Sequence, residues 1–339
     1  MKTLRLICLL SASVAMLLIG CGNDFESSKS NENPPVETPD NPDNPDNPEN
    51  PQPDDPENPQ PDEPENPDTP AQITIPEGYS QLLWSDEFNG DELNLEDWNI
   101  EVNGDGGGNN ELQYYSERGV SIGEMKGEKC LVLTARKESS HGKTCTSGRV
   151  NTMGKITFLH GRIDGRIMVP NTANGLWPAF WLMGDNYKQV GWPKCGEIDI
   201  LEMGNSEGIK NGTQDRYFNG ACHWGEDWRD HMQYAYGVTY DYSLQDGEFH
   251  LFTCIRDSEK VAMYVDLDKY PDAKPYYIMN VNNPDSDRHP ANYLHVPCFV
   301  LLNVAVGGNF TGIWDINQIT ALSSGEASMY IDYVRIFIE

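Results

Sequence analysis

Hydrophobic and polar residues alternate with a period of two along much of residues 71–339, whereas helical periodicity is nearly absent. Period-two runs are typical of β-strands, because successive side chains of a strand point to opposite faces of its sheet. We therefore expect strands at 131–136, 162–169, 249–256, 260–266, 299–306 and 330–338. Many strands separated by turn residues favour an all-β fold, and specifically a jelly-roll sandwich of two sheets.

The octapeptide GEIDILEM places three carboxylates on an otherwise apolar strand. Strict alternation would put Glu197 and Asp199 on one face but would turn Glu202 into the core. One extra residue at Ile200 or Leu201, forming a β-bulge, would return Glu202 to the face of the other two, and such bulges are common beside active sites. The sequence therefore predicts a bulged strand with three carboxylates on one face.

Two of these carboxylates suit the hydrolysis of a glycosidic bond. Glu197 and Glu202 are long enough to lean together, and a retaining glycosidase needs two carboxyl groups ~5 to 5.5 Å apart, one as nucleophile and one as acid then base. The shorter Asp199 is expected to hydrogen-bond a glutamate and, through its charge, to help keep one partner protonated. On the octapeptide alone, a solvated strand face or a calcium site of three carboxylates stays open.

Aromatic and amide side chains elsewhere suggest sugar recognition. Alternation in the run 176–182 puts Trp177 and Trp181 on one face, and flat indoles stack on the apolar faces of pyranose rings. The amides and tyrosines of 109–115 are typical of a loop at the edge of a groove, although a turn followed by an edge strand fits them nearly as well. His223 follows a strand-like run and is within reach of such a cleft, but a lone histidine is often structural.

The first seventy residues have a different composition. Residues 1–20 contain Lys2 and Arg5 before an apolar run that is too short for a stable membrane span, which indicates an export signal. The residues from Leu18 to Cys21 resemble a bacterial lipobox, and that resemblance implies a lipid on Cys21 that anchors the protein to a membrane. The alternative is an ordinary secretory signal with an incidental cysteine.

Residues 21–70 are interpreted as a disordered tether. Positions 31–70 contain fourteen of the 23 prolines and thirteen acidic residues, with no lysine or arginine. Such a composition cannot bury a hydrophobic core. Residues 22–26 resemble the acidic surface-export signal of Bacteroidetes lipoproteins, which implies a location at the outer membrane, on the cell surface.

The net charge of −29 argues against polyanionic ligands. Residues 71–339 remain acidic without basic clusters, whereas nucleic acids and sulfated polymers require lysine and arginine for binding. A neutral polymer fits better, although solubility alone would also explain the charge. Six cysteines lie in this domain, and the sequence leaves open whether they form disulfides or buried thiols; they are Cys130, Cys145, Cys195, Cys222, Cys254 and Cys298.

Seven sequence blocks resemble, in order, the motif set of glycoside hydrolase family 16, and they are most similar to its laminarinase and β-1,3(1,4)-glucanase members. The blocks are 83–88, 110–115, 146–149, 175–181, 196–202, 302–308 and 332–335. The resemblance implies that 71–339 is a catalytic domain with a concanavalin A-like jelly roll and an open groove on its concave face. It further implies retaining, endo-acting hydrolysis of β-1,3-glucan or mixed-linkage β-1,3/1,4-glucan.

The resemblance also implies roles for individual residues. Glu197 would be the nucleophile, Glu202 the acid/base and Asp199 the residue that orients and tunes the nucleophile. The substrate-binding set would be Trp177, Trp181, Asn110, Arg149, His223 and Trp192. Glu87 and Asp332 match the places that hold a structural calcium ion in many members, while catalysis needs no cofactor.

We expect a monomeric catalytic domain that binds a β-glucan and no nucleic acid. Two alternatives stay open at this point. The first is a hydrolase of the same fold that acts on a galactan such as agar, carrageenan or porphyran. The second is a lipoprotein that captures glycans in the same groove without cleaving them.

Overall fold

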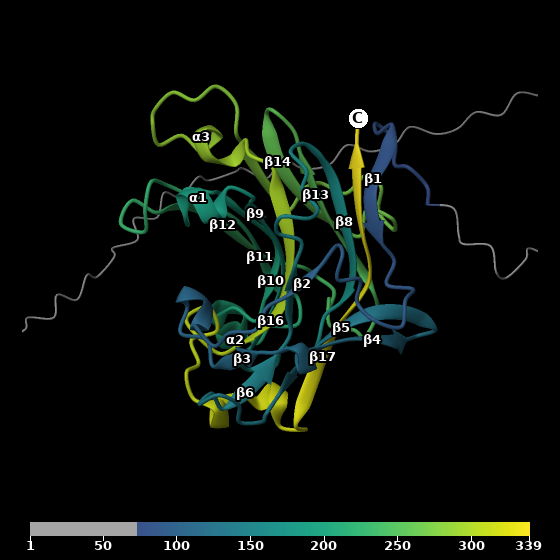
Figure 1. The fold of residues 1–339 in the computed structure, drawn as a ribbon, viewed down its shortest axis with the longest axis vertical. Helices are drawn as coiled ribbons and strands as arrows, with labels where there is room; N and C mark the ends of the chain where they lie inside the picture. Colours follow the sequence, from purple (N-terminus) through teal and green to yellow (C-terminus); the bar gives the residue numbers. More distant parts are fainter. Residues whose placement is uncertain (1–72) are drawn as a thin grey trace, which may run out of the picture. The chain divides into compact units, whose positions relative to one another are not determined.

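The structure is a computed structural model that describes residues 73–339. The predicted signal peptide (1–20), the predicted lipid attachment at Cys21 and the predicted tether (21–70) lie outside the described residues. Within 73–339, strands of two sheets make up most of the secondary structure (Figure 1). None of the helices in this part of the chain has the length and apolar character needed to span a membrane.

The first sheet has ten strands in the order β15-β14-β13-β8-β17-β5-β6-β3, with β1 paired to β17 and β4 paired to β5. Its strands are β1 (Gln81–Asp86), β3 (Gln113–Tyr115), β4 (Val120–Met125), β5 (Glu128–Arg136), β6 (Cys145–Ser147), β8 (Gly161–Met168), β13 (His250–Arg256), β14 (Lys260–Val265), β15 (Tyr277–Asn280) and β17 (Glu326–Ile338).

The second sheet has seven strands in the order β12-β11-β10-β9-β16-β7-β2. Its strands are β2 (Asn99–Ile100), β7 (Arg149–Asn151), β9 (Leu176–Gly184), β10 (Glu197–Met203), β11 (Tyr217–Trp224), β12 (Met232–Thr239) and β16 (Cys298–Val306). Neighbouring strands of this sheet pair antiparallel.

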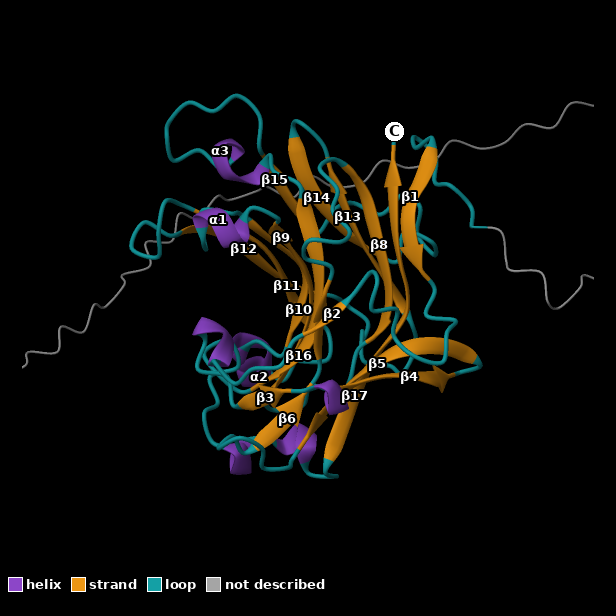
Figure 2. Ribbon diagram, in the orientation of Figure 1, coloured by secondary structure: helices purple, strands orange, loops and turns teal. Residues whose placement is uncertain are grey.

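The helices are short and lie outside the sheets (Figure 2). They are α1 (Tyr187–Val190), α2 (Ser206–Asn211) and α3 (Ala291–Leu294), together with the 3-10 turns η1 (Gly106–Gly108), η2 (Glu117–Gly119), η3 (Ile316–Gln318) and η4 (Thr320–Leu322). The expected all-β jelly-roll sandwich is therefore confirmed, and every period-two run named above lies in a strand, with differences only at the ends.

The hydrophobic core lies between the two sheets and supports the strands that carry the site. Phe180 of β9 is fully buried and its ring packs against Gly165 of β8 in the opposite sheet, where a Cβ atom would approach Phe180 Cε1 to 2.7 Å. Glycine is required there because any side chain would collide with this ring. The back of the second sheet is thus tightly packed.

All six cysteines of the domain are buried, free thiols. Cys195 lies just before the acidic strand in sequence and Cys222 is adjacent to His223, but the two thiols do not form a disulfide bond with each other. Their burial is that of small apolar side chains, and burial raises the pKa of the Cys195 thiol to about 12. Of the two possibilities that the sequence left open, the structure has buried thiols.

Candidate active site

Strand β10 contains the predicted β-bulge. Opposite β11, Asp199 pairs with Ala221 and Glu202 pairs with Asn219, so that two residues of β10 face the single residue Gly220. The register against β9 shifts at the same place. The extra residue resets the alternation of the strand and changes the direction of every side chain that follows it.

The bulge separates the apolar and acidic side chains of β10 cleanly. Ile200 and Leu201 are both fully buried in the core, whereas Glu197, Asp199 and Glu202 line one groove on the other face of the sheet. The strand is entered through Gly196, whose φ of 77° is unfavourable for other residues. The predicted arrangement of three carboxylates on one face is confirmed.

The groove over the second sheet, called the catalytic groove below, has a volume of about 830 Å³. Six strands, β7, β9, β10, β11, β12 and β16, contribute side chains to it, together with residues in 107–111, 187–192 and 309–310. The side chains that line this groove include Trp177, Trp181, Trp192, Glu197, Asp199, Glu202, His223, His231, Arg149, Asn303 and Phe310.

Glu202 is held by an indole. Trp177 Nε1 donates a hydrogen bond to Glu202 Oε1 at 3.1 Å, and Phe310 stacks on the Trp177 ring with centroids 4.5 Å apart and planes within 12°. Burial, followed by the negative charge of Asp199, raises the pKa of Glu202 well above its usual range. This environment favours the protonated form of Glu202, the form that a general acid needs.

Glu197 is the best stabilised of the three as a carboxylate. Burial and the charge of Asp199 raise the pKa of Glu197 to about 8. His223, a hydrogen bond from Trp192 Nε1 to Oε2 at 3.0 Å, and Arg149 act in the opposite direction. Glu197 thus has the most partners that favour its charged form, so a negative charge shared among the three carboxyls is best placed on Glu197 and the proton on Glu202.

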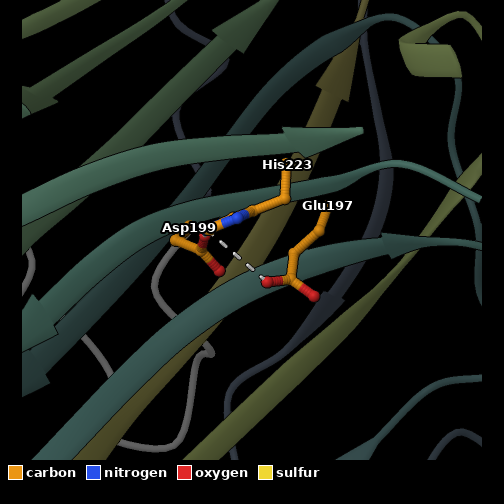
Figure 3. Close-up of side chains that lie close together, drawn as sticks. All are labelled: Glu197, Asp199 and His223. Atoms are coloured by element: carbon orange, nitrogen blue, oxygen red, sulfur yellow. Dashed lines mark ion pairs between the residues drawn. The ribbon is translucent and has the colours of Figure 1, made fainter. Parts of the chain in front are cut away.

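Asp199 lies between the two glutamates in sequence and is almost fully buried, with 5% of its surface exposed. Its Oδ2 lies 3.2 Å from His223 Nε2, and the same nitrogen lies 3.9 Å from Glu197 Oε1. Figure 3 shows the three side chains converging from β10 and β11. Burial raises the pKa of Asp199, so this carboxyl competes with the glutamates for the shared protons.

His223 is fixed by a second histidine that the sequence analysis did not single out. His223 Nδ1 lies 2.9 Å from Nε2 of His231, and the two rings stack at 5.1 Å with planes 14° apart. Trp192 packs against His231 with ring centroids 4.7 Å apart. His223 is thus part of an aromatic stack beside Glu197 and is not an isolated side chain.

Trp181 and Arg149 both line the catalytic groove, as predicted. Trp181 Nε1 donates to Asn303 Oδ1 at 2.9 Å, and the Arg149 guanidinium lies over the Trp181 ring, 4.8 Å from its centroid. Glu101 Oε1 lies 3.2 Å from Arg149 Nε. Arg149 is therefore held by an ion pair while it covers one face of the indole.

Asn110 is the exception among the predicted binding residues. Its side chain donates to Asn309 Oδ1 at 3.1 Å, and its backbone has a φ of 58°. The residues on either side of it, Asn109 and Glu111, line the catalytic groove, and Asn110 does not. The structure thus places Asn110 as a link between two loops at the groove edge, because its left-handed backbone turns the side chain toward Asn309.

Four further groups were missed by the sequence analysis: His231, Asn303, Phe310 and Glu101. Asn303 had a usable signal, because it is the one polar residue in the apolar run 299–306. Phe310 follows the glycine pair of the sixth motif block closely, which is a weaker signal. His231 and Glu101 had no signal in the sequence, because each acts through a partner in another element: His223 for His231 and Arg149 for Glu101.

The two residues expected to hold calcium are each engaged by an arginine. Arg335 donates to both carboxylate oxygens of Glu87, at 2.9 and 2.7 Å, and Arg166 pairs with Asp332. A cation that used these oxygens would have to displace two guanidinium groups, so the side chains as arranged do not fit a calcium ion. Calcium binding stays a prediction.

A jelly-roll sandwich with two half-buried glutamates on one bulged strand, in a groove lined by tryptophans, is the arrangement of a polysaccharide-processing protein, and the site rather than the fold carries this inference. The family model described as "Glycosyl hydrolases family 16" matches residues 110–286. Together with the relatives described next, this match shows the family. The chain belongs to glycosyl hydrolases family 16.

Relatives cover the same part of the chain. The "Beta-glucanase" of Rhodothermus marinus is 30% identical over 266 residues, which are 76% of this chain and 85% of the relative. The "Clotting factor G alpha subunit" of Tachypleus tridentatus is 34% identical over 259 residues, 76% of this chain. The chain spans only 34% of the length of that second relative.

A solved structure agrees with this assignment. A family 16 protein of the Bacteroides ovatus mixed-linkage glucan locus, in complex with a G4G4G3G product, is 38% identical with a TM-score of 0.66. The alignment covers 75% of this chain and 100% of that chain. This identity is high enough for the comparison to bear on the site as well as on the fold.

Proposed function

We propose that this chain is an endo-acting, retaining β-glucanase that cleaves internal bonds of mixed-linkage β-1,3/1,4-glucan or of β-1,3-glucan. One observation carries the proposal: the bulge of β10 puts Glu197 and Glu202 on the same groove face with different hydrogen-bond partners, Trp192 for Glu197 and Trp177 for Glu202. This is the pair that retaining hydrolysis requires. The product in the Bacteroides ovatus neighbour supports the mixed-linkage substrate.

In the first step, Glu202 donates its proton to the glycosidic oxygen while the Glu197 carboxylate attacks the anomeric carbon. The bond to the leaving sugar breaks, and a glycosyl ester forms on Glu197. The indole of Trp177 keeps the Glu202 carboxyl in a fixed orientation for this proton transfer. The N–H of Trp192 holds the other carboxylate from the Oε2 side.

In the second step, Glu202 acts as a base. Esterification removes the negative charge of Glu197, which contributes to the raised pKa of Glu202, so that pKa falls when the ester forms. Glu202 then accepts a proton from water, the water oxygen attacks the anomeric carbon, and Glu197 is released as a carboxylate. Two inversions give net retention of configuration.

The groove favours a neutral polymer over the alternatives. Its lining combines indoles with a few polar side chains and contains one arginine, which is already paired with Glu101. Such a lining suits pyranose rings and offers little to sulfate groups. Capture without cleavage would not need two glutamates on one face, each held by its own indole N–H.

The same proposal extends to location. We propose that Cys21 carries a lipid and that residues 22–70 hold the catalytic domain outside the outer membrane. The lipobox-like residues that end at Cys21 and the proline-rich acidic composition support it. A Cys21→Ser variant released from the membrane fraction would agree with this location, and one retained there would contradict it.

The test of substrate class is to incubate the protein with laminarin, barley mixed-linkage glucan, curdlan and agarose and to resolve the products by size. Early oligosaccharides of several lengths from a soluble glucan are expected. Products from agarose alone would move the substrate to galactans. Glucan binding without any products would favour the capture protein.

A further inference from the structure

The side chains of Glu197, Asp199 and His223 form a compact ligand set that the glycosidase mechanism does not fully use. Each offers one oxygen or nitrogen atom, and these atoms all lie within 4.8 Å of one another (Figure 3). Glu197 and His223 are directly paired residues of β10 and β11. The set is therefore held by the sheet itself.

We propose that Glu197, Asp199 and His223 bind a divalent transition-metal ion, best fitted by Zn²⁺, and that the bound ion competes with the glucan for the catalytic groove. The competition rests on the proposed function, because Glu197 is its nucleophile. The binding site does not rest on it, since it follows from the ligand atoms alone.

The distances suit zinc. A tetrahedral ion with bonds of ~2.0 to 2.1 Å separates its ligand atoms by roughly 3.4 Å. His223 Nε2 lies 3.2 Å from Asp199 Oδ2 and 3.9 Å from Glu197 Oε1. Both distances to His223 Nε2 are within about half an ångström of this value, whereas the Asp199 and Glu197 oxygens lie within 4.8 Å of each other. Rotation of the long Glu197 side chain would bring its oxygen into the same coordination shell.

A second, independent observation concerns Asp199. Its Oδ2 is buried and has no hydrogen-bond partner among residues 73–339, although it faces His223. Only 5% of the Asp199 surface is exposed. A buried carboxylate oxygen without a donor is destabilising, and a cation at this point would satisfy it.

The ligand types select the kind of ion. Zinc accepts both imidazole nitrogen and carboxylate oxygen, and three protein ligands leave its fourth tetrahedral position open, whereas calcium and magnesium prefer oxygen alone. His231 supplies the outer partner that such a histidine needs, because its Nε2 lies 2.9 Å from His223 Nδ1. With Nδ1–H donating to His231, the lone pair of Nε2 points to the metal.

The site is accessible from the catalytic groove. Glu197, Asp199, His223 and His231 all line it, so an ion can enter and can keep a water molecule in the fourth position. A metal bound to Glu197 removes the free electron pair that would attack the sugar. Substrate and metal therefore exclude each other.

The experiment is calorimetric titration of the metal-free full chain with ZnCl₂, followed by laminarin hydrolysis at several zinc concentrations. We expect one saturable site, inhibition that higher laminarin concentrations relieve, and at least tenfold weaker binding in His223→Asn. Glu197→Gln, tested for binding only, should also bind zinc more weakly. The matched control is His141→Asn, because His141 stacks on Tyr114 away from the catalytic groove and the variant retains the acidic N-terminal segment.

Unchanged zinc affinity in both His223→Asn and Glu197→Gln would overturn the site, and so would the absence of saturable binding. Bound zinc that leaves hydrolysis unaffected would overturn the competition. The two proposals fail separately: zinc binding without any glucan hydrolysis by the metal-free protein would refute the glucanase function alone. Hydrolysis without zinc binding would refute the metal site alone.

Discussion

Trp177 of β9 donates its indole N–H to Oε1 of Glu202, on the neighbouring strand, across 3.1 Å. The side chain that the sequence marks as a sugar platform is thus also a positioning partner of the acid/base. Phe310 stacks on one face of the same indole, which leaves only the other face for a sugar ring. Proton donation and sugar binding are therefore coupled through one residue.

Replacing Trp177 by phenylalanine keeps an aromatic ring but removes this N–H. Hydrogen bonds to charged groups contribute ~1.5 to 3 kcal/mol, so we expect kcat on a soluble glucan to fall roughly tenfold to a hundredfold. The bond also lowers the pKa of Glu202; its loss raises that pKa and moves the alkaline limb of the pH profile upward. Trp228→Phe is the control, because Trp228 is 69% exposed and lies outside the groove lining; equal effects in both variants would contradict this role.

Glu197→Gln and Glu202→Gln are expected to differ in their dependence on the leaving group. Loss of a general acid lowers the rate by ~10² to 10⁴, but an activated dinitrophenyl leaving group needs no proton. Glu202→Gln should therefore form the glycosyl ester from such a glucoside, seen as a burst of dinitrophenol. Glu197→Gln should release no burst while still binding polymer, and unchanged hydrolysis by this variant would overturn the choice of nucleophile.

Deleting Ile200 removes the extra residue of the bulge. The shortened run Glu-Ile-Asp-Leu-Glu keeps all three carboxylates on one face by regular alternation, so Glu202 should stay in the groove without a bulge. We expect a folded domain with lowered activity, because Glu202 then lies one residue closer to Glu197 along the strand. Ile200→Val keeps the bulge and should cost only ~0.5 to 1.5 kcal/mol of stability with activity retained. A deletion variant that fails to fold while Ile200→Val stays folded and active would contradict this account of the alternation.

A buried histidine–aspartate contact outside the groove lining is expected to make stability depend on pH. His250 Nδ1 lies 2.7 Å from Asp266 Oδ2, and Asp266 also accepts from the Leu251 N–H and from Lys269. Burial alone would raise the pKa of Asp266, but these partners outweigh it and lower the pKa. The resulting stability is present above the unfolded-state pKa of ~3.9 and is lost as pH falls through the lower folded-state pKa.

Asp266→Asn should therefore destabilise the domain by about 3 to 5 kcal/mol at neutral pH, with a difference from the native chain that shrinks below about pH 4. Thermal unfolding at several pH values measures this. Asp268→Asn removes the same charge from an exposed position and should have little effect. A difference that grows on acidification would contradict the assignment.

The strands and the bulge were predictable from sequence because both follow from local alternation. Each predicted run is a strand, and only a bulge reconciles Glu202 with the apolar Ile200 and Leu201. Charge in a core is so costly that the octapeptide allowed few arrangements. The period of the alternation and the polarity of the residues were therefore sufficient to predict the strands and the bulge.

The partners of the site were much less predictable, because they come from distant parts of the chain. Phe310 covers Trp177 and His231 supports His223 through tertiary packing that no local period encodes. Asn110 shows the same limit, because the sequence predicted it as a groove residue. Its positive φ instead turns the side chain toward Asn309. Sequence alternation gives the face of a strand, whereas loop conformation decides which loop residue reaches a groove.

The most direct test of the Glu197 and Glu202 assignment is the anomeric configuration of the first product. Barley mixed-linkage glucan is mixed with the protein in an NMR tube, and the new reducing ends are followed before mutarotation equilibrates them. The double displacement on Glu197 predicts that the β-anomer appears first and that the α-anomer grows in later. An initial α-anomer would mean single displacement by water and would contradict the account of Glu197 as nucleophile.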